Sequence, residues 1–333
     1  MNYFISIIQQ SFNWMLTVQH QRVKNNVTNP ESKGTPLIQR LREEKERQKD
    51  LCSESTDKNR KTAINALEAF CKQTMTGQPS LTLEELSEDH IKAFEIFELR
   101  EGSKPSYVAE HMRSLRSLIN KIIDPAKGCQ LFRKVRTSNC QTDKRAVSEE
   151  VVNLLKNLLL PENSRMAFAR DIFLICFYGM GIPLIDLAFL KKSQLKDGYI
   201  TYYRQKTHRK VRVKLTPELK ELLDRLSTED SPYLLPILTS EDTQVARKEY
   251  RRFYQRYSRA LARISELLGN GVHLTSYVAR HSWASIAYKN GVDINVIARA
   301  LGHANTNITY AYIRDIDDSM LADAGRIVCN AVQ

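Results

Sequence analysis

The chain has 333 residues, of which 42% are hydrophobic, and a formal net charge of +12. This length predicts two domains. The apolar fraction is sufficient for a folded core, which excludes an intrinsically disordered protein. The basic balance favours a polyanionic partner, most often a nucleic acid, but it carries no information about the fold.

The N-terminal residues 1–18 are apolar, yet they have neither a basic start nor a small-residue cleavage site. Gln9, Gln10 and Asn13 interrupt the run, so we expect an amphipathic helix rather than a signal peptide or a membrane span. The six cysteines form no C-x-x-C pair and no zinc spacing with a histidine. We therefore expect a reduced, cytoplasmic protein with no metal site and no membrane partner.

The first half of the chain predicts a helical domain between two linkers. Residues 1–36 are expected to form an N-terminal extension that ends in a polar linker with proline and glycine. Residues 37–124 carry apolar side chains at helical spacing, which predicts a small helical bundle. Within this bundle, Thr82 followed by Glu85 predicts a helix that begins with a capping box. Residues 125–146 are basic and rich in turn formers, so we expect an interdomain linker.

The second domain is expected over residues 147–333 and contains the clearest β signal of the chain. Residues 211, 213 and 215 are apolar and alternate with basic residues, which is the period-two pattern of a half-buried strand. Residues 199–203 form the partner run of a hairpin, and helices precede and follow it. The expected fold class is therefore mainly α with a small β-sheet or hairpin (α+β).

Residues 274–313 contain three residue types that together can cleave a phosphodiester. Arg280 begins an amphipathic helix, His303 follows Gly302, and Tyr312 comes nine residues after His303. A tyrosine oxygen can attack phosphorus, although it is a weak nucleophile at its free pKa near 10. A guanidinium matches the charge that gathers on the phosphate oxygens and cannot lose its proton.

This segment resembles the C-terminal motif of the tyrosine recombinase (phage integrase) family, and it is most similar to integrases of Bacteroides-type mobile elements. The family pattern is His-x-x-Arg, Leu-Gly-His and a tyrosine nine residues further on. It falls on residues 277–280, on residues 301–303 and on Tyr312, with Tyr277 in place of the first histidine. The resemblance assigns the nucleophile to Tyr312 rather than Tyr310, which a helix would turn to another face.

The resemblance covers about residues 37 to 333. It implies a helical core-DNA-binding domain (37–124) and a tyrosine-recombinase catalytic domain that ends in a packing tail. The implied function is a site-specific DNA recombinase that cleaves and rejoins DNA through a 3′-phosphotyrosine, for integration, excision or inversion of a mobile element. No cofactor is implied. The implied partners are double-stranded DNA, a homotetramer on paired sites and accessory DNA-bending proteins.

The resemblance also implies roles for individual side chains. Arg280 and Tyr277 would hold the phosphate, and His303 would either hydrogen-bond a non-bridging oxygen or assist the tyrosine proton. Lys206 on the hairpin turn would protonate the departing 5′ oxygen. Other basic residues are expected to contact the DNA backbone, which would make binding strongly salt-dependent. These candidates are Lys144 and Arg145 in the linker, Lys210 and Arg212 on the hairpin, and Arg170 on the preceding helix.

The sequence departs from the family pattern at the first catalytic arginine. The family has that arginine a few residues before an acidic residue and a leucine, and here Met180 occupies the position. Loss of one arginine from a phosphoryl-transfer site can cost roughly 10³ to 10⁵ in rate. Either another cation fills the gap, from Arg165, Arg170 or Arg204, or the protein binds DNA and cleaves weakly or not at all. A monomeric type IB topoisomerase is a third alternative with the same chemistry.

Overall fold

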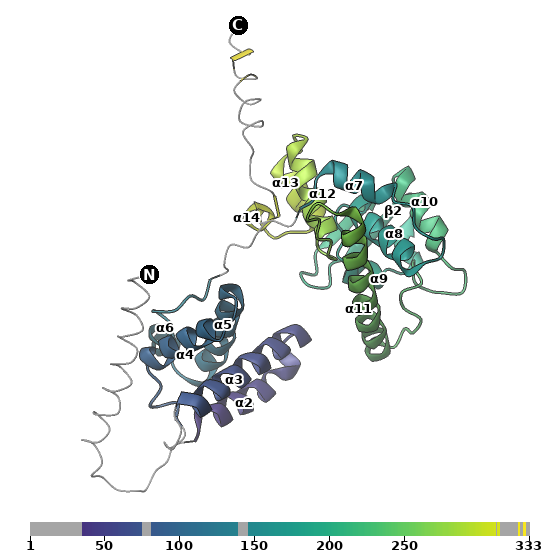
Figure 1. Cartoon of the computed structure of the whole chain (residues 1–333). Coiled ribbons are helices and arrows are strands. Elements are labelled where there is room, and N and C mark those ends of the chain that lie inside the picture. The colour runs from purple at the N-terminus through teal and green to yellow at the C-terminus, as the bar shows by residue number, and fades with distance from the viewer. Residues whose placement is uncertain are drawn as a thin grey trace, which may run out of the picture. The chain divides into compact units, whose positions relative to one another are not determined.

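The structure is a computed structural model that describes residues 35–74, 81–138, 146–310, 312–313, 326 and 329–330. The chain forms two compact units, residues 1–142 and residues 143–333 (Figure 1). None of the helices in the described ranges is long and apolar enough to cross a bilayer.

The first unit is built from helices. They are α2 (Leu37–Arg47), the 3₁₀ turn η1 (Lys49–Leu51), α3 (Glu54–Thr74), α4 (Glu88–Arg100), α5 (Pro105–Ile122) and α6 (Pro125–Leu131). Helix α5 packs against α3 and α2, and its apolar face, which includes Met112 and Leu115, is fully buried. Residues 125–138, expected in a linker, also contribute to this unit, because Phe132 and Val135 lie in its core.

The helix expected to begin at Thr82 begins later, so that prediction was wrong. Helix α4 starts at Glu88 with Ser87 as its cap, and the Ser87 hydroxyl accepts the His90 backbone N–H. The Thr82 N–H does donate to the Glu85 carboxylate at 3.0 Å, as a capping box requires. Residues 83–85 nevertheless form an isolated turn, because the same local hydrogen bond can close a turn that no helix follows.

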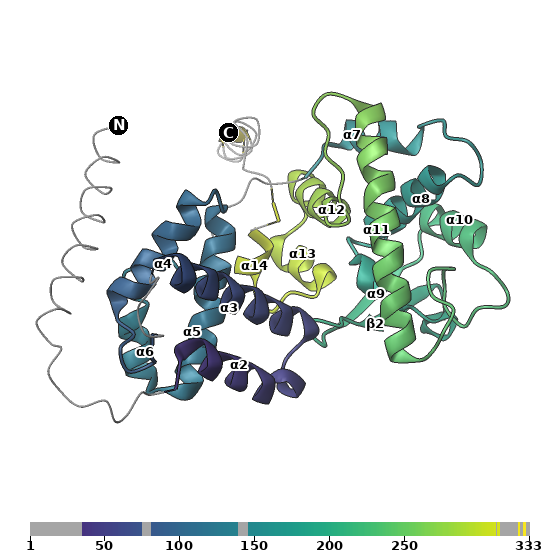
Figure 2. The same ribbon diagram turned by 60° about the horizontal axis from the view of Figure 1, so that its bottom comes forward.

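The second unit contains the remaining elements. They are α7 (Glu149–Lys156), α8 (Arg165–Tyr178), α9 (Leu184–Ala188), the 3₁₀ turn η2 (Lys192–Gln194), β1 (Leu195–Lys196), β2 (Tyr199–Tyr203), β3 (Lys210–Lys214), α10 (Pro217–Leu226), α11 (Thr243–Leu268), α12 (Val278–Lys289), α13 (Ile294–Leu301) and α14 (Thr306–Tyr310). Helix α8 packs against α10, α11 and α12 (Figure 2). It is buried continuously from Asp171 to Cys176, and residues 172–176 are all apolar, as expected for a helix segment with neighbours on every side.

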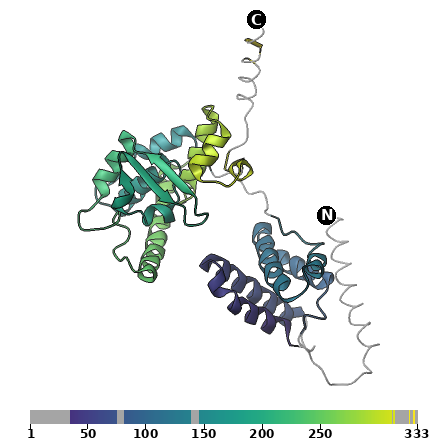
Figure 3. The same ribbon diagram turned by 180° about the vertical axis from the view of Figure 1, so that it is seen from behind.

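The strands form one antiparallel sheet in the order β1-β2-β3 (Figure 3). Ile200 pairs with Val213 and Tyr202 pairs with Val211, and these four side chains are buried. The basic residues of β3 alternate with them and are exposed. The expected mainly α fold with a small β hairpin is therefore confirmed. Strand β1 was not expected, because two residues are too few to display a period.

Candidate active site

Arg280 lies in the first turn of α12 and is fixed by three residues from two other segments. It is only 2% exposed. Its Nη1 donates to the Gly181 carbonyl at 2.8 Å, and its Nη2 donates to the Leu301 carbonyl at 2.6 Å and to His303 Nε2 at 2.9 Å. Burial lowers the pKa of Arg280, but a guanidinium remains charged at any physiological pH.

His303 is a neutral imidazole in a single tautomer. Gly302 ends α13 in the left-handed conformation, and the chain then turns so that His303 lies beside Arg280. Since a guanidinium can only donate, Nε2 must be the acceptor, and Nδ1–H donates to Thr309 Oγ1 at 2.9 Å. Burial and the neighbouring charge of Arg280 lower the pKa of His303 to about 3, so the ring stays uncharged near neutral pH.

Tyr312 follows α14 and its ring contacts two histidine rings. The ring centroids are 4.6 Å from His281 and 4.8 Å from His303. The Tyr312 carbonyl accepts a hydrogen bond from Ser285 Oγ at 3.1 Å, which ties this part of the main chain to α12. The Tyr312 hydroxyl donates to the Tyr277 hydroxyl at 3.4 Å, and burial raises the pKa of Tyr312 to about 12.

A second buried guanidinium lies beside Arg280. Arg204 directly follows β2, is 4% exposed, and donates through Nη1 to the Leu301 carbonyl at 2.5 Å. Arg204 and Arg280 therefore share one acceptor. Arg204 Nε lies 2.8 Å from Oδ2 of Asp186, a buried carboxylate on α9. We call Arg204, Arg280, Asp186 and His303 the guanidinium cluster.

The segment that carries Met180 touches both arginines of the cluster. Gly181 passes so close to Arg280 that an added Cβ would lie 3.0 Å from Arg280 Cα and Cγ. Asp186, the acidic residue that the family pattern has after its first arginine, pairs with Arg204, and its Oδ1 also accepts the Gln205 N–H at 2.9 Å. Burial raises the pKa of Asp186, while the neighbouring Arg204 opposes that change.

The basic residues expected on the hairpin lie outside the cluster. Lys206 is exposed on the turn, two residues after Arg204. Lys210 is exposed on β3, and Arg212 stacks over the Tyr199 ring with its Cζ 3.7 Å from the centroid. Lys144 and Arg145 fall outside the described residues.

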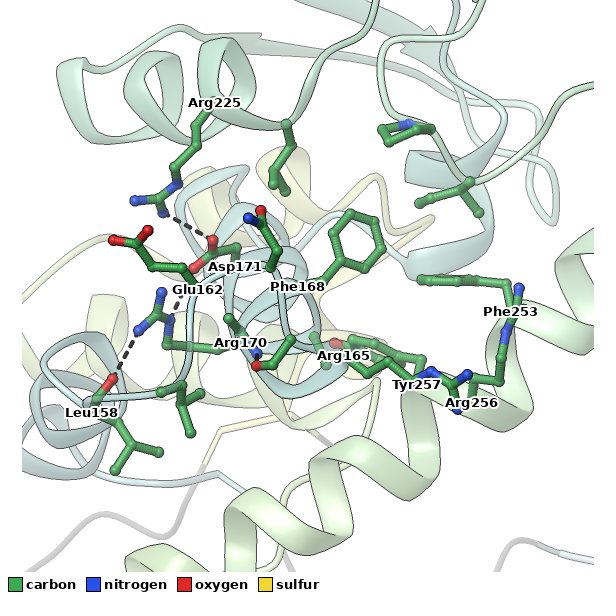
Figure 4. Close-up of a pocket in the computed structure, with 18 of the residues that line it drawn as sticks. Leu158, Glu162, Arg165, Phe168, Arg170, Asp171, Arg225, Phe253, Arg256 and Tyr257 are labelled. Atoms are coloured by element: carbon green, nitrogen blue, oxygen red, sulfur yellow. Dashed lines mark hydrogen bonds and ion pairs between the residues drawn. The ribbon is translucent and has the colours of Figure 1, made fainter.

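Arg170 lies in a different pocket. Its Nε is 2.9 Å from Asp171 Oδ1 and its Nη1 donates to the Leu158 carbonyl at 2.8 Å. Arg225 pairs with the other oxygen of Asp171 at 3.0 Å. These groups line a pocket of about 810 Å³, as does Arg165, and Figure 4 shows Arg170 pointing toward Leu158 and Asp171. Of the three candidates for the missing cation, only Arg204 contacts the groups that hold Arg280.

The cluster has the charge and the groups to hold a phosphodiester. Two guanidiniums and one carboxylate leave a net charge of +1, because His303 is neutral. A DNA phosphodiester carries a single negative charge. Arg280 Cζ is 5.4 Å from the centre of the Tyr312 ring, so a tyrosine oxygen lies close to the bound position of such an anion. The structure brings Arg280, His303 and Tyr312, which the sequence pattern named, close together. The pairing of Arg204 with Asp186 was not predicted, although Arg204 was one of three candidates for the missing cation.

Residues 145–318 match the model of the phage integrase family. The tyrosine recombinase XerA of Pyrococcus furiosus is 27% identical over 179 residues, which cover 51% of this chain and 57% of that protein. The tyrosine recombinase XerD of Oceanobacillus iheyensis is 22% identical over 240 residues, which cover 69% of this chain and 78% of that protein. The chain thus spans little more than half the length of the Pyrococcus relative.

Two solved integrases have a similar fold. Lambda integrase (residues 75–356), solved as a dimer bound to a COC′ core site, superposes with a TM-score of 0.64 at 18% identity, over 85% of this chain and 99% of that one. The Tn1549 transposon integrase, solved with a circular intermediate DNA, gives a TM-score of 0.63 at 14% identity, over 88% of this chain and 100% of that one. At these identities the similarity establishes the fold alone.

Proposed function

The chain belongs to the phage integrase family, and from this premise we propose that it is a site-specific DNA recombinase that uses Tyr312 as its nucleophile. The observation that carries the proposal is the position of the Tyr312 ring, 4.8 Å from the His303 ring and 5.4 Å from the guanidinium carbon of Arg280. Phosphoryl transfer requires a nucleophile and fixed groups that stabilise the charge on the phosphate. Here the tyrosine ring lies next to a neutral imidazole and a fixed cation.

In the proposed reaction, the Tyr312 oxygen attacks the scissile phosphorus and the bond from phosphorus to the 5′ oxygen breaks. The tyrosine proton leaves to water, and the Lys206 ammonium gives a proton to the departing 5′ oxygen. The products are a 3′-phosphotyrosine ester and a free 5′-hydroxyl. Attack by a 5′-hydroxyl from another strand reverses these steps, so the bond energy is conserved and the reaction consumes no cofactor.

His303 and Tyr277 have supporting roles in this proposal. His303 Nε2 accepts from Arg280, and Thr309 holds the other ring nitrogen, so His303 acts as a positioning residue for the guanidinium. Tyr277 contacts the Tyr312 hydroxyl and can donate to a phosphate oxygen once DNA is bound.

The proposed assembly is a homotetramer on two DNA sites, with a Holliday junction as intermediate, assisted by accessory DNA-bending proteins. Lambda integrase has been solved as a dimer on a core site and as a tetramer on a Holliday junction, which supports a multimeric assembly on DNA for this chain. The proposed role is integration, excision or inversion of a mobile element, which the similarity to a transposon integrase supports.

A DNA-binding relative without cleavage, suggested by Met180, is the less favoured alternative. Its rationale was the absence of a second cation at the phosphate. Arg204 supplies a buried guanidinium next to Arg280, so the substitution at position 180 does not by itself imply loss of cleavage.

Covalent capture tests the function and identifies the DNA site in the same experiment. The full-length protein is incubated with nicked duplexes whose central sequence is randomised, and DNA that stays attached after denaturation in SDS is sequenced. We expect a shared sequence in the captured DNA, no capture by Tyr312→Phe, and normal capture by the matched control Tyr310→Phe. Wild-type protein that binds duplexes without ever becoming attached would support the DNA-binding alternative, and capture by Tyr312→Phe would exclude Tyr312 as nucleophile.

A further inference from the structure

We infer that Arg204 is a catalytic residue that contacts the scissile phosphate and takes the place of the arginine absent at Met180. The inference rests on the proposed function. It adds a group from the end of strand β2, held by a carboxylate on α9, to the site formed by Arg280, His303 and Tyr312.

The first support is that Arg204 and Arg280 are held in equivalent ways. Each donates to the Leu301 carbonyl, at 2.5 Å and 2.6 Å, and each is almost completely buried. Two guanidiniums that share one acceptor oxygen must lie side by side. A phosphate that contacts Arg280 therefore lies within reach of Arg204 as well.

The second support comes from the glycines beside the two arginines. Gly181 lies against Arg280, and Gly302 lies against the hairpin, where an added Cβ would be 2.9 Å from Val211 Cγ2 and 3.2 Å from Arg204 Cγ. Both glycines have positive φ, 67° and 66°. The end of α13 therefore packs closely against the hairpin, and Arg204 is part of that contact.

The third support is the anchoring of Arg204 by Asp186. The side chains of this pair are 5% and 2% exposed, and the Gln205 N–H donates to the same carboxylate. A carboxylate six residues after Met180 therefore fixes a cation from the hairpin rather than one from its own segment. The anchored guanidinium is preorganised, which is the condition for electrostatic stabilisation of a transition state.

The fourth support is the energetic cost of the arrangement. Two buried guanidiniums repel each other, and Arg204 contributes to the lowered pKa of Arg280. A single carboxylate leaves one positive charge uncompensated, and the buried Arg280 Nε has no hydrogen-bond partner within the described residues. An uncompensated buried charge lowers stability unless a bound anion neutralises it.

The test uses the duplex recovered by covalent capture and measures the single-turnover rate of adduct formation by the full-length protein. Removing Arg204 alone would leave Asp186 unpaired in the interior, so the main variant combines Arg204→Met with Asp186→Asn. We expect this variant to form adduct roughly 10³-fold more slowly than wild type, the low end of the range for a lost phosphoryl-transfer arginine. Its affinity for the duplex should change by less than about tenfold.

Two arginines provide matched controls. Arg170→Met tests the rival candidate, and Asp171 keeps Arg225 as its partner in that variant. Arg225→Met removes a partly exposed cation of α10, and Asp171 keeps Arg170 as its partner in that variant. We expect Arg225→Met to form adduct within about tenfold of the wild-type rate, as for a group that makes no transition-state contact. At saturating protein, Arg170→Met should lose far less of the rate than the Arg204 variant does. A large loss in Arg170→Met, without one in the Arg204 variant, would overturn the inference in favour of Arg170.

A neutral phosphate separates contact from a structural role. In duplexes with a methylphosphonate at the scissile position, one non-bridging oxygen is replaced by methyl and the negative charge is lost. If Arg204 contacts that charge, the ratio of the wild-type rate to the rate of the Arg204 variant should fall by about tenfold or more in at least one diastereomer. An unchanged difference in both diastereomers would overturn the inference.

The outcomes also distinguish the inference from the function on which it rests. Adduct formation by the wild type, with an Arg204 variant that is folded and within about tenfold of its rate, would refute the role of Arg204 and leave the recombinase proposal intact. Absence of adduct from the wild type would refute both.

Discussion

At the scale of single residues, Gly181 in the loop before α9 packs against Arg280 and helps to fix its position. It has a φ of 67°, and its own carbonyl accepts from the guanidinium whose side chain it borders. Any side chain at position 181 would have to displace Arg280, because the obstructing atoms are the Cα, Cβ and Cγ of Arg280 and not a flexible tip. Gly181 is therefore part of the geometry of the site although it carries no chemistry.

Gly181→Ala is predicted to reduce both stability and adduct formation. The left-handed backbone alone should cost about 1–2 kcal/mol of unfolding free energy, and the contact with Arg280 adds to this. Displacement of Arg280 should slow adduct formation by roughly 10²-fold, the effect of a misplacement of about 1 Å. Urea unfolding and the single-turnover capture assay measure the two effects.

Gly198→Ala is the matched control for this prediction. Gly198 has a similar φ of 73°, but nothing lies within 4 Å of an added Cβ. It should lose the backbone contribution to stability and keep the wild-type rate of adduct formation. Equal rates for the two variants would contradict the role given to Gly181.

The sequence predicted one part of the site better than the other for a physical reason. Arg280 lies in α12, and His303 and Tyr312 come just after α13 and α14, so all three can be recognised by their spacing along the chain. Arg204 meets the Leu301 carbonyl across 97 positions of sequence. That contact depends on how the hairpin packs against α13, which no local pattern specifies. Arg204 was therefore only one of three candidates.

At the scale of elements, the hairpin was predictable and the start of α4 was not. The alternation along β3 is strong because one of its faces is buried and the other is exposed. The helix start at Ser87 uses a histidine as the reciprocal partner of the cap, whereas Thr82 and Glu85 offered the commoner pair of residue types three positions apart. Cap chemistry alone could not tell a helix start from an isolated turn.

The hairpin turn also carries the proposed proton donor. Lys206→Ala is predicted to slow adduct formation on the captured duplex by roughly 10²- to 10⁴-fold, the range for loss of a general acid. A duplex with sulfur in place of the bridging 5′ oxygen should restore the rate, because a thiolate leaves without protonation at a pKa of about 8.5. Capture assays on the two duplexes measure the rescue.

Lys210→Ala is the control for Lys206, since Lys210 is exposed on the adjoining strand. At saturating protein it should keep the wild-type rate on both duplexes, because a contact to the DNA backbone affects binding and not proton transfer. Arg280→Ala should be slow on both, because the sulfur does not replace a phosphate contact. A Lys206→Ala variant that remained equally slow on the sulfur duplex would exclude Lys206 as the proton donor.

At the scale of the whole molecule, the net charge of +12 is expected to act through many weak phosphate contacts. The exposed face of β3 presents Lys210, Arg212 and Lys214, and Arg212 is held against the Tyr199 ring. In contrast, Lys220 on α10 is exposed but pairs with Asp224. The basic residues of β3 should therefore contribute more to DNA binding than Lys220 does, although each adds one positive charge to the protein.

Salt dependence of DNA binding can separate these contributions. The measurement uses a Tyr312→Phe background, which should bind without cleaving. Lys210→Gln combined with Lys214→Gln is predicted to make the negative slope of log K against log salt less steep by about 1.8, or about 0.9 for each lost phosphate contact. Lys220→Gln should leave the slope unchanged, because its charge is already compensated in the free protein. Fluorescence anisotropy of a labelled duplex between low and moderate salt gives the slopes. Equal slopes for all three proteins would mean that the β3 face does not contact DNA and that the basic charge acts elsewhere on the chain.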